Sequence, residues 1–246
     1  MKKPSWEFKL GVALILFSIA IYAIKFLFLG DPQNSYFYVF NALGFLPINV
    51  LLVTIILNQL LIMRSRKEKL EKLNMVIGTF FSEAGTKLLS LFSDADPNLE
   101  KIRNRLIVNN GWSDEEFSRV HVELKRYNYT VDIKKMDFTQ LGEFLTNQRD
   151  FLLRLLENPS LLEHTAFTEL LRAVFHLTEE LDSRDELINL PESDYAHLAG
   201  DIQRAYTLLV SQWLDYMNYL RKNYPYLFSL AMRKNPFDHD ASPIVR

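Results

Sequence analysis

Two long apolar runs, separated by a very short polar stretch, dominate the start of the chain. Residues 10–30 form the first run and contain a single charge, Lys25. At about 1.5 Å per helical residue, this run of roughly 21 residues is long enough to cross a hydrocarbon layer of about 30 Å. A second apolar run covers residues 36–63, and only Asp31–Ser35 lies between the two. The pattern predicts an antiparallel transmembrane hairpin over residues 1–63, with spans at about 10–30 and 36–63.

A cleaved signal peptide is the alternative for the first run, because Lys2 and Lys3 precede it. The run is long, no small-residue cleavage site follows it, and the second run begins almost at once. These features favour a retained membrane span.

Residues 64–246 have the 3.6-residue periodicity of amphipathic helices and predict a cytosolic α-helical domain. A helix is expected to continue from the second span as far as Pro97, and shorter helices are expected beyond it. Three capping patterns mark further helix starts: Ser113 with Glu116, Asp137 with Gln140, and Ser160 with Glu163.

The longest helix of this domain is predicted over residues 192–222, and residues 125–136 read as a loop. The fold class is therefore all-α: a two-helix transmembrane hairpin followed by a cytosolic multi-helix bundle. The pattern leaves open whether residues 64–128 and 137–232 form one bundle or two.

Polar residues interrupt the second span. An amide in hydrocarbon needs a hydrogen-bonding partner, because leaving it unpaired there is costly. One interpretation is packing between helices, where amides bond across the interface. The other is the lining of a pore, with a proline bend. Both predict self-association. Asn58 and Gln59 lie close enough to the end of the span to reach the cytosolic interface. The residues expected at the packing surface or pore are Asn41, Gly44, Pro47 and Asn49.

Basic residues flank the hairpin and set its orientation. Lys2, Lys3 and Lys9 precede or begin the first span, and the connection Asp31–Ser35 has no Lys or Arg. Because basic residues stay on the cytoplasmic side, both termini are expected to be cytoplasmic in a multi-pass protein of the cell membrane. A second basic segment is expected to bind anionic headgroups. It consists of Arg64, Arg66, Lys67, Lys69 and Lys72.

Composition excludes several classes of function. The net charge is −2 and no cysteine occurs. The lack of a basic field argues against nucleic-acid binding. The absence of cysteine excludes disulfides, thiolate metal sites and a cysteine nucleophile. No HExxH, Walker or G-x-S-x-G motif is present, so no catalytic residue and no enzymatic activity are predicted.

The histidines offer the remaining candidate chemistry. His197 follows Asp194 by three positions, and His176 precedes Glu179 and Glu180. A dinuclear metal site could be built from these residues. Surface or helix-capping histidines explain the pattern more simply, so no metal and no cofactor are predicted. The five histidines are His121, His164, His176, His197 and His239.

The C-terminal tail departs from the helical pattern. Asn235–Phe237 reads NPF, a tripeptide that some adaptor domains bind, and Asp238–Asp240 reads DHD, which could hold a cation loosely. The simpler interpretation is that Phe237 packs against the bundle.

These observations predict a membrane-anchored, self-associating helical protein. Its partners are the lipid bilayer, further copies of itself, and a cytosolic protein or small ligand that the bundle binds or senses. The alternative is a small homo-oligomeric ion channel, with a pore lined by the second span and gated by the cytosolic domain.

Overall fold

The computed structural model describes residues 6–29, 32–161 and 164–245, and these residues contain no strand. The prediction of an all-α chain is therefore confirmed for them. The chain divides into two compact units, residues 1–66 and 67–246.

The first unit consists of α1 (Trp6–Leu29) and the beginning of α2 (Pro32–Phe80). The predicted loop Asp31–Ser35 was wrong in length, because α2 already begins at Pro32. A proline suits the first helical position, where its missing N–H would have no intrahelical partner. Near this connection, Lys25 Nζ lies 4.7 Å from the centroid of the Tyr38 ring.

One helix of the described residues is long and apolar enough to cross a membrane by length and composition alone. This helix is α2, the candidate span starts within it at Tyr36, and its most apolar part has no buried residue.

Helix α2 stays helical as far as Phe80 and enters the core of the second unit through Leu73, Ile77 and Phe80. The helical path then continues to Asp94, as the sequence predicted, but through a π-helix that it did not reveal. This π-helix, η1 (Phe81–Gly85), precedes α3 (Thr86–Asp94). The wider turn is visible in the bond from the Thr86 N–H to the Phe81 carbonyl, five residues earlier.

Glycine is required at the end of this π-helix. A Cβ atom on Gly85 would lie 2.6 Å from Phe81 Cδ1 and 2.8 Å from Phe80 Cε1. Both rings are buried in the core and have no free space into which to move.

The substitution Gly85→Ala is therefore expected to lower the free energy of unfolding by about 1–3 kcal/mol, the usual cost of overpacking a core. Gly200→Ala is the matched control, because a Cβ there would meet nothing within 4 Å. In this exposed helical position alanine should stabilise by about 0.5–1 kcal/mol. Urea denaturation of both variants checks the prediction, and equal effects would contradict it.

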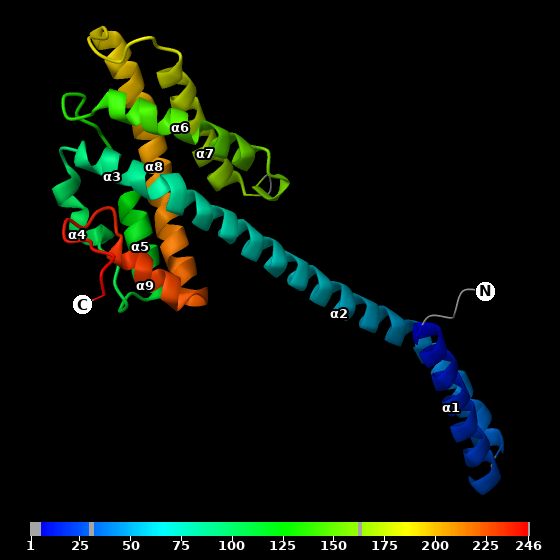
Figure 1. Ribbon diagram of the computed structural model, residues 1–246. Helices are drawn as coiled ribbons and strands as arrows, with labels where there is room; N and C mark the ends of the chain where they lie inside the picture. Colours follow the sequence, from blue (N-terminus) through cyan, green and yellow to red (C-terminus); the bar gives the residue numbers. More distant parts are fainter. Residues whose placement is uncertain (1–5, 30–31, 162–163, 246) are drawn as a thin grey trace. The chain divides into compact units, whose positions relative to one another are not determined.

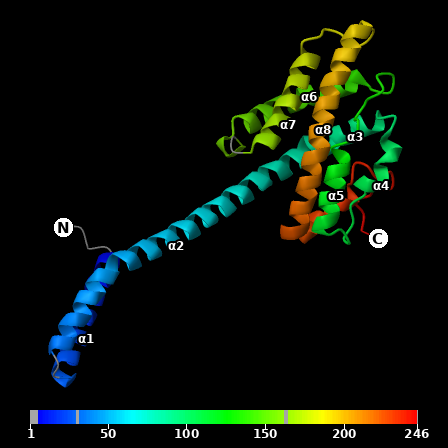
Figure 2. The ribbon, with the colours of Figure 1, turned by 180° about the vertical axis from the view of Figure 1, so that it is seen from behind.

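The second unit is one bundle, which answers the question the sequence left open. A single hydrophobic core runs from Leu73 to Phe237. The long helix α8 is contacted by α3, α5, α7 and α9, and Figure 1 shows these helices around it, with the same arrangement seen from behind in Figure 2. The helices beyond α3 are α4 (Arg103–Leu106), α5 (Asp114–Leu124), α6 (Phe138–Leu156), α7 (Thr165–Asp182), α8 (Glu192–Asn223) and α9 (Pro225–Arg233).

Helix α8 reaches so many neighbours because its buried residues recur every three or four positions and extend round much of its surface. Its bounds agree with the predicted helix 192–222 within one residue. The predicted loop 125–136 also holds, since no helix or strand forms there. The predicted helix that follows Pro97 is instead broken into a 3-10 turn, η2 (Leu99–Lys101), and the single turn of α4.

Two of the three predicted caps are present. The Ser113 side chain accepts a hydrogen bond from the Glu116 N–H, and Asp137 accepts one from the Gln140 N–H. The Glu116 carboxylate itself accepts a hydrogen bond from Arg119.

The third cap was wrong. Helix α7 is capped by His164, whose Nδ1 accepts a hydrogen bond from the Phe167 N–H at 3.1 Å. Ser160 lies in a separate 3-10 turn, η3 (Pro159–Leu161), and Glu163 lies outside the described residues.

The NPF tripeptide packs into the bundle, as predicted. Phe237 is buried and meets the Trp213 ring edge-on at 5.2 Å between centroids. The buried Asn235 donates a hydrogen bond to the Leu106 carbonyl and accepts one from the Phe237 N–H. In this fold the tripeptide is not exposed for an adaptor domain to bind.

Candidate functional site

The residues expected at a packing surface or pore all lie on α2, and all are exposed. No hydrogen bond joins the amides of Asn41 or Asn49 to other described residues, and a Cβ on Gly44 would meet nothing within 4 Å. Pro47 lies inside the helix. The described part of a single chain therefore supplies no partner for these groups.

The basic segment Arg64–Lys72 is also exposed on α2. Lys67 lies 4.0 Å from Glu71, one helical turn away, in an ion pair between two exposed side chains. Arg64 and Lys69 also take part in polar interactions. An exposed pair such as Lys67–Glu71 is worth little in water.

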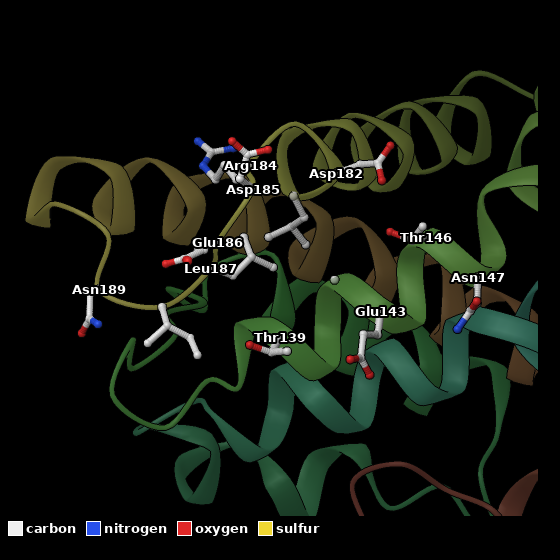
Figure 3. Close-up of a pocket in the computed structure, with 13 residues that line it drawn as sticks. Thr139, Glu143, Thr146, Asn147, Asp182, Arg184, Asp185, Glu186, Leu187 and Asn189 are labelled. Carbon is white, nitrogen blue, oxygen red and sulfur yellow. The ribbon is translucent and has the colours of Figure 1, made fainter.

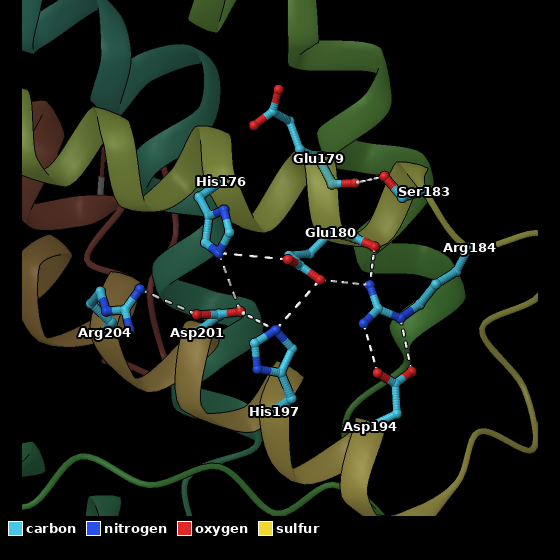
Figure 4. A network of polar contacts seen from close by, with 9 residues as sticks. All are labelled: His176, Glu179, Glu180, Ser183, Arg184, Asp194, His197, Asp201 and Arg204. Atoms are coloured by element: carbon cyan, nitrogen blue, oxygen red, sulfur yellow. Dashed lines mark hydrogen bonds and ion pairs between the residues drawn. The ribbon is translucent and has the colours of Figure 1, made fainter.

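The five histidines occupy different environments. His121 lies 3.6 Å from Asp215 on α8, His164 caps α7, and His239 is exposed in the tail. His176 and His197 instead lie in one polar cluster between α7 and α8 (Figure 4).

We define this α7–α8 cluster as His176, Glu180, His197 and Asp201. On each helix a histidine precedes a carboxylate by four residues, so both side chains project from one face, one turn apart. Glu180 comes from the last turns of α7 and His197 from the first turns of α8, and the two helices pack together there.

The contacts in the cluster alternate between nitrogen and oxygen. His176 Nε2 lies 3.7 Å from Glu180 Oε1 and 3.7 Å from Asp201 Oδ2. His197 Nε2 lies 3.5 Å from Glu180 Oε2 and 3.4 Å from Asp201 Oδ2. His176, Glu180 and Asp201 each offer a ligand atom within 4.8 Å of the other two, which is the spacing of residues that could hold a metal ion.

Burial differs sharply across the cluster. The Asp201 side chain is only 5% exposed, whereas those of His176 and His197 are 45% and 52% exposed. The Asp201 Oδ2 atom is buried and has no hydrogen-bond partner. The cluster is therefore open to solvent on the histidine side and has a carboxylate oxygen at its base.

Two arginines hold the carboxylates from outside. Arg204 Nη1 lies 3.3 Å from Asp201 Oδ1, the oxygen that faces away from the histidines. Arg184 Nη1 lies 3.0 Å from Glu180 Oε2, while its Nε and Nη2 bind both oxygens of Asp194 at 2.8 and 2.7 Å.

These hydrogen bonds shift the ionisation of the carboxyls. The Arg184 guanidinium lowers the pKa of Glu180 and of Asp194 below their usual values, chiefly through the hydrogen bonds it donates. Both groups are therefore ionised at neutral pH. The bidentate bond also shows that Asp194, which the sequence paired with His197, is the partner of Arg184.

A second feature lies beside the cluster. A cavity of about 790 Å³ opens between α6, the end of α7 and the connection to α8 (Figure 3). Its lining combines polar and charged side chains with the apolar side chains of Leu181, Leu187 and Ile188, and Arg184 is shared between the cavity and the cluster. The carboxylates around it are those of Glu143, Asp182, Asp185 and Glu186.

The sequence contains a signal for this cluster beyond the pairs that were predicted from it. His176 precedes Glu180 by four residues, and His197 precedes Asp201 by four. That repeated spacing identifies two helix faces of the same chemistry. The prediction paired His197 with Asp194 and did not include Asp201.

Both parts of the chain match families of known sequences. Residues 69–233 match the domain described as uncharacterized protein MJ1433, C-terminal helical domain, and residues 2–61 match MJ1433, N-terminal helical domain. The uncharacterized protein MJ1433 of Methanocaldococcus jannaschii is 46% identical over 230 residues, which are 94% of this chain and 92% of that protein. The chain belongs to the MJ1433 family. No solved structure matches it. The boundary between the two MJ1433 domains lies close to the division between residues 66 and 67.

Proposed function

We propose that this chain is a membrane-anchored helical protein: residues 1–63 cross the membrane twice and leave the bundle in the cytosol. The observation that carries the proposal is the surface of α2. Every residue from Tyr36 to Met63 is exposed, and none of them is charged. Leu51, Leu57 and Met63, for example, are 59%, 54% and 65% exposed.

Water is an unfavourable surrounding for such a surface. Soluble proteins rarely expose a continuous apolar area of more than a few hundred Å². Hydrocarbon removes this cost, and a helix satisfies its own backbone hydrogen bonds there. The apolar run of α1, with its single charge at Lys25, supports a second span.

The polar groups of α2 support self-association. Asn41 and Asn49 would be costly in hydrocarbon without partners, and contact with α2 of another copy would provide them. Such interhelical bonds contribute about 1 kcal/mol each. This pairing is the simplest role for amides within the span.

The bundle is the part that would meet a cytosolic partner or ligand. The acidic cavity beside the α7–α8 connection supports such a role, because it is large enough for a small ligand or a peptide side chain. The basic segment Arg64–Lys72 would hold the start of the bundle near anionic headgroups.

Labelling of single cysteines tests the topology, because the natural sequence has none. Ser35→Cys places a thiol between the two proposed spans, and Ser118→Cys places one on an exposed position of α5. In intact cells a membrane-impermeant maleimide is expected to label the first variant, whereas the second should react only after permeabilisation. The positive-inside distribution of Lys and Arg is the reason.

The cysteine-free parent is the control for background labelling, and extraction of membranes at alkaline pH shows whether the chain is integral. Labelling of Ser118→Cys in intact cells would reverse the proposed orientation. A chain that stays in solution without detergent would refute the membrane anchor.

A further inference from the structure

We propose that the α7–α8 cluster, His176, Glu180, His197 and Asp201, binds one first-row divalent metal ion of the Zn²⁺ type. This inference goes beyond membrane anchoring and does not depend on it. It rests on the spacing of the four side chains and on the unpartnered oxygen at the base of the cluster.

The spacing fits four ligands around one ion. In a tetrahedral zinc site, nitrogen and oxygen ligands lie about 2.0–2.2 Å from the metal, and so about 3.3–3.6 Å from each other. The four nitrogen–oxygen separations in the cluster are 3.4–3.7 Å. Asp201 Oδ2 faces both histidines, whereas Glu180 presents Oε1 to His176 and Oε2 to His197. His176, Glu180 and Asp201 already offer ligand atoms that lie within 4.8 Å of one another. His197 Nε2 lies 3.5 Å from Glu180 Oε2 and 3.4 Å from Asp201 Oδ2, so a rotation of its half-exposed side chain would bring it to the same ion.

The buried oxygen gives independent support. Asp201 Oδ2 has no hydrogen-bond partner, and both imidazole nitrogens that face it are more than 3.3 Å away. A buried carboxylate oxygen without a donor is costly. A cation at the centre of the cluster would satisfy it, and Figure 4 shows this oxygen directed toward both histidines.

The surrounding residues are arranged as an outer shell. Arg204 lies next to the other oxygen of Asp201. Arg184 binds Glu180, and Asp194 neutralises the charge of Arg184. Outer partners of this kind orient the ligands of a metal site. Arg184 is shared between two carboxylates, and its bond to Glu180 Oε2 leaves Oε1 facing His176.

The ligand chemistry selects the metal. Two imidazoles favour zinc and its first-row neighbours, whereas Mg²⁺ and Ca²⁺ prefer oxygen ligands throughout. Four protein ligands leave no open position, which is typical of structural rather than catalytic zinc sites. The ion would therefore fasten α7 to α8 next to their connection.

Zinc binding to the purified full chain in detergent, without a histidine tag and after chelator treatment, tests the proposal. We expect one Zn²⁺ per chain, a rise in Tm on binding, and no displacement by excess Mg²⁺ or Ca²⁺. Co²⁺ serves as a second probe, because its visible absorption is much stronger with four ligands than with six.

His176→Gln and His197→Gln should each weaken zinc binding at least about 100-fold, since even outer-shell partners contribute 10–100-fold. His121→Gln is the matched control. It removes a histidine that also faces a carboxylate, at 3.6 Å from Asp215, but lies outside the cluster. Its affinity for zinc should equal that of the parent.

Asp201→Asn keeps the size of the side chain. This variant should retain the helical bundle and lose most of the zinc affinity. Circular dichroism without metal shows whether each variant is folded. Absence of stoichiometric zinc binding by the parent would overturn the proposal. So would binding that is unchanged in both His176→Gln and His197→Gln.

Discussion

Replacing Phe80 with alanine is expected to lower the free energy of unfolding of the bundle by about 3–5 kcal/mol, the usual cost of removing a buried phenylalanine. Phe80 is fully buried at the point where α2 enters the core. Its ring meets those of Phe81 and Phe167 edge-on, at 5.3 and 5.4 Å between centroids. The loss would combine apolar contact, these aromatic pairs and the cavity left behind.

Urea denaturation followed by tryptophan fluorescence measures this effect, because Trp213 is buried in the same core. Leu70→Ala is the matched control, since Leu70 lies on the same helix but is 54% exposed. Its effect should stay within about 0.5 kcal/mol, as for other surface positions. If the two variants were equally stable, α2 would not contribute Phe80 to the core as described.

The second large effect is expected at Asn235, where substitution by leucine should destabilise the bundle by about 2–5 kcal/mol. Asn235 is buried and joins two backbone groups: Nδ2 donates to the Leu106 carbonyl and Oδ1 accepts from the Phe237 N–H, each at 2.9 Å. Leucine has a similar volume, so the loss would come from two buried groups left without partners.

Asn74→Leu is the matched control, because it makes the same substitution at an asparagine whose hydrogen bond is exposed. Asn74 Nδ2 also donates to a backbone carbonyl, that of Leu70, at 2.8 Å, but the bond is exposed. Water can replace it, so the change should lie within about 0.5 kcal/mol. The same denaturation experiment compares the two variants. A small loss of stability in Asn235→Leu would mean that the hydrogen bond to Leu106 does not hold the tail against α4.

Local features of the fold were largely predictable from the sequence. Ser113 and Asp137 cap helices as expected, because a capping bond joins residues only three positions apart. The long helix α8 was predicted almost to its ends, since its apolar positions recur over many turns. The failures were also local: His164 replaced Ser160 as a cap, and a π-helix interrupted the path between α2 and α3.

By itself, the sequence determined that the chain is helical, where most helices begin and end, and that its apolar residues are concentrated at the start. These properties depend on neighbouring residues and on periodicity along one segment. Only the tertiary structure decided that Asp201 lies beneath His176 and His197, and that Asn235 bonds to Leu106, far away in the chain. Such pairs depend on which helix faces meet and in what register, and packing of the whole core sets that register.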